Sequence, residues 1–507
     1  MPPGAFQCSV EVRQLWYNPL QRFALVAQLT DQEAGLGFAD LELRATGSKT
    51  AAGSSERGGR LDRDWTKGSI SRNLLSISWP MIVSSLLMHL GPIIDMIWVG
   101  RLGAASVAGV GVASITVQVA SSVRMGLQTG TRALVARSIG AGDKAGANHV
   151  AQQTLIVTIA FAVVMAIIGV FLAEPILRAL RVQSDVVAAG AQYMRVQLIG
   201  TVAMSFTMMN QSIMQASGDS LTPMKIDLGY RLLHMALCPF LVFGWWIFPR
   251  FGVSGAALSS VITQGIGGSI GLWILYSGRT RIRLTLKRFR LDWKTVWRIV
   301  RVGVPASATG MQRNLGQLVL VGFIIPFGTF AVAAHTLTQR IDGFLHMPAS
   351  GLGQGAGVLA GQNLGAGLPK RAEKTGWTAA ILFTGFMMIS AVIVWFWAEN
   401  VVAIFNSEPG MTAVTATFLR INIIAYLAFG MEMVLMNCLN NMGDTMVPLV
   451  SEVSTIWAMQ MPLAYFLPKS ASLGVYGVRL AVVMSDFTRA VIYAIYFKSG
   501  RWQRKKV

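Results

Sequence analysis

Runs of about 20 mostly apolar residues recur along the chain from Trp65 onward, and each is long enough to cross about 30 Å of hydrocarbon as an α-helix. Of the 507 residues, 53% are hydrophobic and 13% are charged, which excludes an ordinary soluble domain. The sequence therefore predicts an all-α polytopic membrane protein with twelve transmembrane helices. The predicted spans are approximately 73–99, 106–135, 150–172, 187–215, 223–248, 254–277, 298–325, 331–359, 376–397, 412–438, 446–467 and 473–498.

An internal repeat relates matching motifs in the two halves of the chain, with a constant offset of 225 between their residue numbers. The matching pairs are Pro80 and Pro305, Leu90-Gly91 and Leu315-Gly316, Gly103 and Gly328, Gly140-Ala141-Gly142 and Gly365-Ala366-Gly367, Gly218-Asp219 and Gly443-Asp444, and Pro223 and Pro448. Because each half holds six predicted spans, an even number, both halves enter the membrane from the same side. We expect two parallel six-helix repeats around an axis along the membrane normal, with the substrate site between them and transport by alternating access.

Positive charges gather before the first span, between the sixth and seventh spans, and in the C-terminal tail. With twelve spans these segments lie on one side, which the positive-inside rule identifies as the cytoplasm, here of a bacterial inner membrane. This topology accounts for the net charge of +20 without a nucleic-acid partner. The expected parts are a disordered cytoplasmic N-terminal extension over 1–66, an N-lobe over 67–278, a basic cytoplasmic linker over 279–297, a C-lobe over 298–498 and a basic cytoplasmic tail over 499–507. A misassigned start codon is an alternative explanation for residues 1–66.

The sequence indicates no bound metal and no cofactor other than a coupling ion. The three cysteines, Cys8, Cys238 and Cys438, are far apart, which fits neither a disulfide framework nor a CxxC metal site. The loops around Gly140 and Gly365 follow neither the GxGxxG nor the GxxxxGK[ST] pattern, so no nucleotide-binding module is indicated. A gradient of H+ or Na+ is therefore the expected energy source.

The first span carries one acid, Asp95, near its outer end. Met88, Gly91 and Asp95 share one helical face, while isoleucines and leucines cover the other, so the acid is expected to point inward. A carboxylate inside a bilayer costs about 3 kcal/mol and is usually paired, protonated or part of an ion path. The alternative is that Asp95 reaches the outer interface or pairs with Arg101.

These features resemble the MATE family, the multidrug and toxic compound extrusion transporters of the MOP flippase superfamily. The resemblance rests on the acid before VGRLG, the loops ARSIGAGDKAGA and AGQNLGAGLPKRA, the segments QASGDSLTP and NNMGDTMVP, and FGVSGAALSSVI. It covers the chain from about residue 70 to the end. It implies a cation-coupled antiporter, driven by H+ or Na+, that expels organic cations and other amphipathic compounds, with Asp95 as a coupling-ion site.

The fifth span departs from one branch of that family, in which an Asn and, four residues later, an Asp supply oxygen ligands. His234 stands at the Asn position and Cys238 at the Asp position. Neither side chain suits a hard cation, which argues against an all-oxygen Na+ cage. Histidine titrates near neutral pH, so the replacement favours H+ as the coupling ion. The alternative for His234 is a neutral ring bonded to a backbone carbonyl.

Other groups of the N-lobe complete this expected site. Asp227 and Arg231 lie one turn apart on the face that carries His234, and they are expected to form an ion pair. The family resemblance implies that Ser260, in the sixth span, supplies a hydroxyl group. The expected ion-coupling residues are Asp95, His234, Ser260, Cys238 and Asp227.

The C-lobe carries its own polar face on the eighth span, and the repeat offset places no ionisable residue at the equivalent positions of the second span. This asymmetry favours a substrate site or a second protonation site, and the alternative is a structural pairing of Asp342 with Arg313 or Arg340. The tenth span adds Glu432 as a further candidate for this site. The alternative role of Glu432 is a structural salt bridge to Arg420 or Arg313. The expected residues of this second site are Glu432, Asp342, His346, Gln339, Tyr426, Met88 and Arg313.

Arginines within the spans complicate the choice of substrate. Arg124, Arg231 and Arg313 either pair with internal acids or face an anionic substrate. On the last span, Asp486 is expected to join Arg479 and Arg489 in an ionic cluster near the cytoplasm.

The leading hypothesis is an antiporter coupled to H+ rather than Na+ that exports amphipathic organic compounds or drugs, acting as a monomer in the bilayer. The alternatives are a lipid or lipid-linked oligosaccharide flippase and an organic-anion exporter. A more remote alternative is a lipid-modifying membrane enzyme, which would need acids or histidines clustered at one interface, whereas the acids here are scattered.

Overall fold

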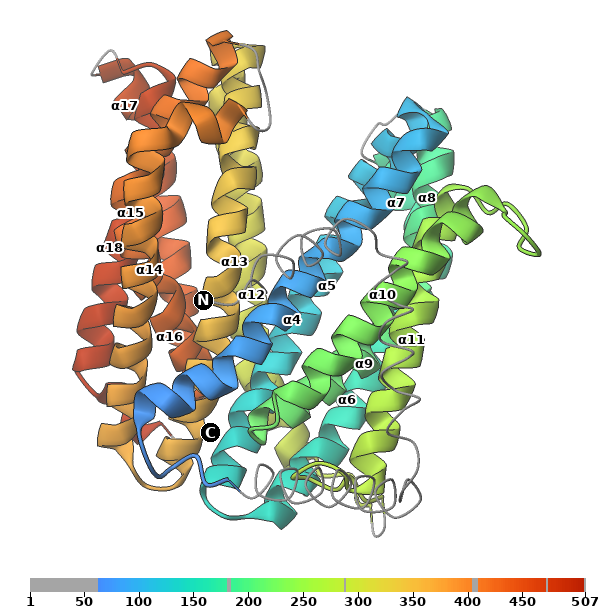
Figure 1. Ribbon diagram of the computed structural model, residues 1–507, viewed down its shortest axis with the longest axis vertical. Helices are drawn as coiled ribbons and strands as arrows, with labels where there is room; N and C mark the ends of the chain where they lie inside the picture. The colour runs from blue at the N-terminus through green and yellow to red at the C-terminus, as the bar shows by residue number, and fades with distance from the viewer. Residues whose placement is uncertain (1–62, 180–183, 287–288, 404–408, 471–472, 506–507) are drawn as a thin grey trace, which may run out of the picture. The chain divides into compact units, whose positions relative to one another are not determined.

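The computed structural model describes residues 63–179, 184–286, 289–403, 409–470 and 473–505 (Figure 1). The chain divides into two units, Met1–Arg63 and Asp64–Val507, and the described helices belong to the second. The extension expected over residues 1–66 lies almost entirely outside the described residues. Among the described residues every regular element is a helix, as predicted for an all-α membrane protein.

The helices fall into two halves. The first half contains α4 (Ile70–Val99), α5 (Ala104–Gly140), α6 (Lys144–Phe171), α7 (Ala173–Ala179), α8 (Ser184–Ile199), α9 (Thr201–Ala216), α10 (Leu221–Phe243) and α11 (Val253–Ser277). The second contains α12 (Trp293–Ile324), α13 (Thr329–Gly365), α14 (Pro369–Ala403), α15 (Pro409–Asn441), α16 (Met446–Val453), α17 (Met461–Ser470) and α18 (Val475–Lys498). Figure 1 draws the first half from blue to green and the second from yellow to red.

The repeat offset reappears in the helix boundaries. The first residues of α5 and α13 differ by the repeat offset of 225, and so do their last residues. The same offset relates the 3-10 turns Gly100–Leu102 and Ile325–Phe327. The connections repeat as well, because Gly103 and Gly328 have positive φ angles of 109° and 95°, which residues with a side chain rarely adopt. The predicted architecture of two repeats is therefore confirmed.

The twelve predicted spans correspond to these helices, although two spans are broken. The span at 187–215 is divided at Gly200 between α8 and α9, and the span at 446–467 passes from α16 through a π-helical segment, Ser454–Gln460, into α17. Among the described residues, eight helices are long and apolar enough to cross a membrane by length and composition alone. α12 and α13 are also long enough to cross a membrane, but arginine, histidine and glutamine side chains make them more polar than those eight helices.

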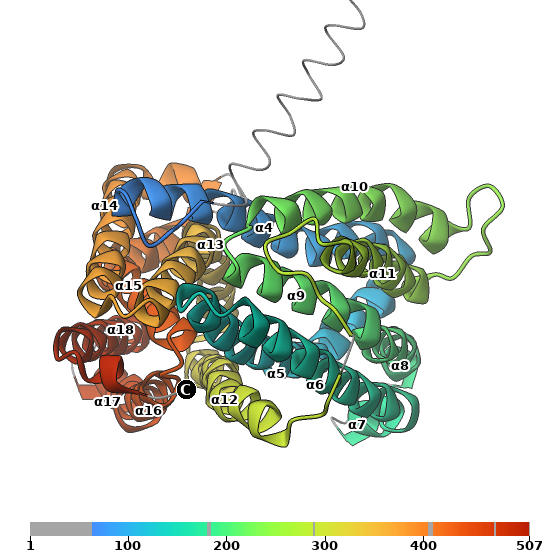
Figure 2. The same ribbon diagram turned by 90° about the horizontal axis from the view of Figure 1, so that it is seen from below.

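The first helix of each half packs on both halves. Leu74 of α4 lies in a core of the second half, whereas Ile94 of the same helix lies in a core of the first. In α12, Ile299 packs with residues of α5, α6 and α9, and Leu320 packs with α17 and α18. Figure 2 shows α4 between α10 and α13, and it contacts both. These two helices therefore join the N-lobe, α4–α11, to the C-lobe, α12–α18.

The two lobes meet at the end of the helices that carries the basic loops. Gly140, the last residue of α5, lies so close to Gln362 of α13 that a Cβ atom would overlap the backbone of Gln362. Gly365, the last residue of α13, lies in the same way against the backbone of Arg137 on α5. The two contacts are equivalent under the repeat offset, so α5 and α13 cross symmetrically and close the structure at this end.

Asp292 links the basic linker to the start of α12. Its carboxylate accepts hydrogen bonds from the Thr295 hydroxyl at 2.7 Å and the Lys294 backbone N–H at 2.9 Å, and it lies 3.2 Å from His149 Nε2 of α6. The hydrogen bond from Thr295, followed by that from His149, lowers the pKa of Asp292 to about 2.

A lowered pKa makes the stabilising contribution of Asp292 dependent on pH. The contribution is complete above the unfolded-state pKa of about 4 and is lost as the pH falls towards 2. We expect Asp292→Asn to lower the unfolding temperature slightly at pH 6, and we expect the difference from the wild type to shrink below about pH 4. Thermal unfolding of both proteins in detergent across this range measures the effect. An equal difference at every pH would contradict it.

Candidate ion-coupling sites

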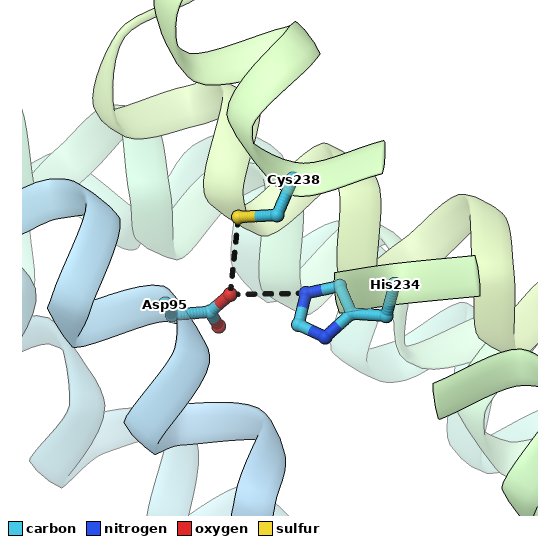
Figure 3. A group of neighbouring side chains, drawn as sticks. All are labelled: Asp95, His234 and Cys238. Atoms are coloured by element: carbon cyan, nitrogen blue, oxygen red, sulfur yellow. Dashed lines mark hydrogen bonds and ion pairs between the residues drawn. The ribbon is translucent and has the colours of Figure 1, made fainter. Parts of the chain in front are cut away.

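Asp95 lies in a buried polar cluster formed by α4, α10 and α11, and the residue is 4% exposed. Figure 3 shows its carboxylate facing His234 and Cys238, both on α10. Asp95 Oδ1 lies 3.1 Å from His234 Nε2 and 3.9 Å from Cys238 Sγ. Ser260 Oγ of α11 lies 3.5 Å from Asp95 Oδ2 and 3.0 Å from His234 Nε2. The structure therefore brings together four of the five residues expected at this site.

The hydrogen bonds of His234 determine where its proton lies. Arg231 Nη1 is 3.3 Å from His234 Nδ1. A guanidinium group can only donate, so Nδ1 has to accept, and the neutral ring carries its proton on Nε2. That N–H faces the carboxylate of Asp95. His234 therefore points its Nε2–H at the Asp95 carboxylate and connects α10 to α4.

The same cluster has a composition that can attract a metal ion. The ligand atoms of Asp95, His234 and Cys238 lie within 4.8 Å of one another. However, Nδ1 of the histidine accepts from Arg231 and Nε2 carries the proton, so neither ring nitrogen offers a free lone pair. With this arrangement of protons, His234 cannot act as a metal ligand.

Two pairings considered from the sequence do not form in the described part of the chain. Asp227 accepts a hydrogen bond from Gln211 Nε2 of α9, while Arg231 turns towards His234 instead of pairing with Asp227. The guanidinium group of Arg231 lies against Gly91 of α4, where a Cβ atom would overlap it. The expected ion pair is therefore wrong, because Asp227 bonds to Gln211 of α9 and Arg231 bonds to His234 of its own helix.

The pairing of Asp95 with Arg101 is the second that does not form in the described part of the chain. The guanidinium carbon of Arg101 lies 4.9 Å above the centre of the Trp98 ring. It does not pair with Asp95, whose carboxylate instead points to α10 and α11.

Asp342 of α13 is the centre of a separate buried network in the C-lobe. Arg479 Nη2 of α18 lies 2.5 Å from Asp342 Oδ2. Tyr426 Oη and Asn422 Nδ2, both on α15, donate to the carboxylate at 2.7 Å each. The pairing of Asp342 with Arg313 or Arg340 is therefore wrong, and Arg479 belongs to this network and not to a cluster with the other charges of α18.

A second C-lobe network surrounds Glu432 of α15. Arg489 Nε of α18 lies 3.0 Å and Arg313 Nη2 of α12 lies 3.3 Å from Glu432 Oε1. Both arginines also reach Glu452 of α16, and Arg489 contacts Asp486. Three carboxylates face two guanidinium groups, so one negative charge is uncompensated within the network when all five groups are ionised. Of the two salt bridges considered for Glu432 from the sequence, the one to Arg313 forms, whereas Arg420 pairs with Glu399 at 2.8 Å.

Glu452 was not among the residues expected from the sequence, although a signal for it exists. The repeat offset makes Glu452 the partner of Asp227. Each lobe therefore carries a buried acid at this position, and in the C-lobe it stands just before the π-helical segment. Such segments are frequent at functional sites.

The remaining expected residues lie around these networks. His346 stacks on Phe429 with ring centres 3.5 Å apart, and Gln339 is half-buried on the same helix, α13. Met88 of α4 is 38% exposed and occupies the repeat position of Arg313, whose guanidinium lies 3.8 Å from the sulfur atoms of two methionines of α15. The role of these residues in binding a substrate stays a prediction.

The Glu432 network provides a test of stability. Replacing Arg489 by Met leaves Arg313 as the only cation of the network beside three buried or half-buried acids. Breaking a buried pair on one side costs about 3–5 kcal/mol of unfolding free energy. The matched control is Arg420→Met, which removes an exposed pair with side chains 37% and 49% exposed and is expected to cost less than about 1 kcal/mol. Unfolding of purified proteins in detergent measures both, and equal losses would contradict the account.

The fold and these sites define a class of protein. Two six-helix repeats in a membrane, with ionisable side chains buried inside each lobe, are typical of a membrane transporter and not of an enzyme. The family model MatE matches residues 80–240 and 305–466, two segments whose first residues are related by the repeat offset. The chain therefore belongs to the MatE family, the multidrug and toxic compound extrusion transporters, as its sequence motifs indicated.

Known proteins resemble the chain over most of its length. The probable multidrug resistance protein YpnP of Bacillus subtilis is 25% identical over 445 residues, which cover 88% of this chain and 98% of YpnP. A MOP superfamily transporter of Pyrococcus furiosus, described as having a binding pocket of reverse polarity that suggests a different function, aligns with a TM-score of 0.81 and 22% identity over 87% of this chain and 98% of its own. An outward-facing MATE transporter aligns with a TM-score of 0.80 and 22% identity over 86% of this chain and 96% of its own. The solved structures support the twelve-helix, two-repeat fold.

Proposed function

We propose that the protein is an H+-coupled antiporter that exports amphipathic organic compounds, acting as a monomer with its basic loops and termini in the cytoplasm of a bacterial inner membrane. The observation that carries the proposal is the buried contact between the Asp95 carboxylate and the Nε2–H of His234. It offers one exchangeable proton in a setting that excludes water. The multidrug resistance name of YpnP supports the substrate class.

The ligands of the Asp95 site favour H+ over Na+. A hard cation prefers a cage of several oxygen atoms. Among the four side chains here, Asp95 and Ser260 provide oxygen, whereas His234 provides nitrogen and Cys238 provides sulfur. A proton needs a single carboxylate oxygen, which Asp95 supplies.

Protonation of Asp95 changes a contact that joins α4 to α10. The neutral acid attracts the His234 Nε2–H and the Ser260 hydroxyl less strongly than the carboxylate does. α4 contains Pro80 and Pro92, which interrupt its backbone hydrogen bonds, and it packs on both lobes. A proton at Asp95 therefore acts on the helix that connects the lobes, which links protonation to their relative movement.

The Glu432 network is the proposed attraction for a cationic substrate and the candidate for a second proton. When all five of its groups are ionised, its one uncompensated negative charge lies beside Arg313, whose side chain is 30% exposed, and beside the flexible methionines of α15. Methionine side chains adapt to ligands of different shapes. A positively charged amphiphile would gain both charge attraction and apolar contact there.

One observation favours a second candidate, the export of organic anions. Arg132 of α5 is 5% exposed, faces the C-lobe and donates to Gln354 Oε1 at 2.6 Å. In the described residues, no carboxylate lies within ion-pair distance of this guanidinium group. A positive charge between the lobes favours an anionic substrate, and the binding pocket of reverse polarity reported for the Pyrococcus furiosus transporter is in line with such variation.

Transport in everted membrane vesicles tests the proposal. The quenching or release of a fluorescent organic cation is followed after an H+ gradient is imposed and then collapsed, and again with Na+ as the only gradient. We expect uptake that needs the H+ gradient and is unaffected by Na+. Uptake of an organic anion alone would favour the second candidate, and movement without any ion gradient would contradict both.

A further inference from the structure

A small pocket lies inside the N-lobe between α5, α6 and α9, which pack against one another. It is built by helices other than α10 and α11, which hold the partners of Asp95. Its lining combines one arginine with hydroxyl and amide groups and with apolar side chains such as Phe161 and Met209, and no acidic side chain lines it. The polar lining includes Arg124, Gln128, Thr154, Thr158, Ser205 and Ser212.

Arg124 brings a positive charge to this pocket without a matching negative charge. Its Nη2 donates to Ser121 Oγ at 3.1 Å, and its Nη1 lies 3.7 Å from the sulfur of Met204. Its buried Nε has no hydrogen-bond partner in the part of the chain that the structure describes. No carboxylate of the described residues lies within ion-pair distance of it, whereas the C-lobe arginines Arg313 and Arg489 are paired with acids.

Ser205 of α9 is a second group in the same pocket that needs a partner. It is 4% exposed, and its hydroxyl has no hydrogen-bond partner among the described residues. A hydroxyl group rotates freely and can donate to an acceptor in the pocket. A buried polar group without a partner is unfavourable, and so is an uncompensated charge inside a membrane-spanning segment. One acceptor with a negative charge would satisfy both groups.

The size of the pocket limits what this acceptor can be. Its volume of about 20 Å³ accommodates one water-sized sphere. A carboxylate or phosphate group brings several atoms and exceeds this space, whereas a halide ion is close to it. We propose that the pocket binds one monovalent inorganic anion, with chloride as the species of fitting charge and size, held by Arg124 and the Ser205 hydroxyl.

This anion is a resident part of the N-lobe and goes beyond the proposed transport function. Arg124 lies on α5 and Ser205 on α9, so a shared anion would hold these two helices together. α5 also carries the Gly140 contact that closes the lobes at the basic-loop end. The occupied pocket would thus keep the N-lobe rigid as a unit while it moves against the C-lobe.

Chloride dependence of the purified full-length protein tests the proposal. Thermal unfolding is measured in chloride and in gluconate at equal ionic strength and pH, and binding of radioactive chloride is measured by equilibrium dialysis. A ligand that binds only the folded state raises the unfolding temperature with its concentration. We expect a saturable rise with chloride, one bound ion per chain, and a chloride affinity at least about tenfold weaker in Arg124→Gln.

The control is Arg178→Gln, which removes an exposed arginine of the N-lobe that pairs with Glu174 and does not line the pocket. It should bind chloride like the wild type. If Arg124→Gln fails to fold, Ser205→Ala takes its place and is expected to weaken chloride binding several-fold. Equal unfolding in chloride and gluconate with no bound chloride would mean that water alone fills the pocket, and that result would overturn the proposal. Unchanged chloride binding in Arg124→Gln or Ser205→Ala would overturn it as well.

Discussion

Replacing Asp95 by Asn is expected to reduce H+-driven transport to the background level, a loss of at least about tenfold. Asn has nearly the same size, and its carbonyl oxygen can still accept from the Nε2–H of His234 at the place where the carboxylate lies 3.1 Å away. The variant should therefore fold, but it has no group that exchanges a proton at this position. The measurement is dye uptake into everted vesicles at matched expression, with an imposed H+ gradient.

Two further variants separate the proton carrier from its neighbours. Asp143→Asn changes an acid that caps α6 outside the predicted spans, where it accepts from the Gly146 N–H at 2.7 Å, and it should transport normally. His234→Gln retains an N–H donor for Asp95 and should keep a measurable part of the coupling. If Asp95→Asn transported like the wild type while His234→Gln did not, the carrier would be the histidine and the assignment would fail.

Replacing Gly365 by Leu is expected to shift the protein away from the state in which the basic-loop end is closed. A side chain at this position overlaps the backbone of Arg137 on α5, and the crossing helices have no space to give. Overpacking of this kind costs about 1–3 kcal/mol, which changes the ratio of the two states about five- to 150-fold. Gly140→Leu, the repeat partner, should have the same effect because its side chain meets Gln362.

A cysteine reporter at the closed end measures this shift. Ala136 of α5 is fully buried and lies opposite Gly361 of α13, so Ala136→Cys should react with a maleimide only when this end opens. We expect rapid labelling from the basic-loop side in the Gly365→Leu background. The matched control is Gly343→Leu on the same helix, where a Cβ atom meets nothing within 4 Å. Slow labelling in both backgrounds would show that the crossing of α5 and α13 does not control the opening.

The fold could be predicted from the sequence because its signals are periodic and repeated. Apolar runs of membrane-spanning length predicted the helices, and the repeat offset predicted equivalent boundaries, such as those of α5 and α13. The meeting of Asp95 with His234 and Ser260 was expected from helical spacing together with the family resemblance. Their roles in ion coupling remain a proposal that the experiments above address.

The partners of the charged residues were harder to predict. Helical spacing shows which residues share a face, but it does not show which helix packs on that face. Asp227 and Arg231 are one turn apart, yet each finds a partner elsewhere, and Asp342 pairs with Arg479 from a helix 137 residues further along the chain. Glu452 could have been found by applying the repeat offset to Asp227.

Proton release on substrate binding tests the central claim most directly. Purified wild-type protein in weakly buffered detergent solution is mixed with an organic cation that it transports, and the pH change is followed with and without Na+. Because ion and substrate oppose each other in an antiporter, we expect release of about one H+ per chain in the wild type, independent of Na+, and none in Asp95→Asn. Equal release from Asp95→Asn, or a response that depends on Na+, would contradict the assignment of Asp95 as the proton carrier.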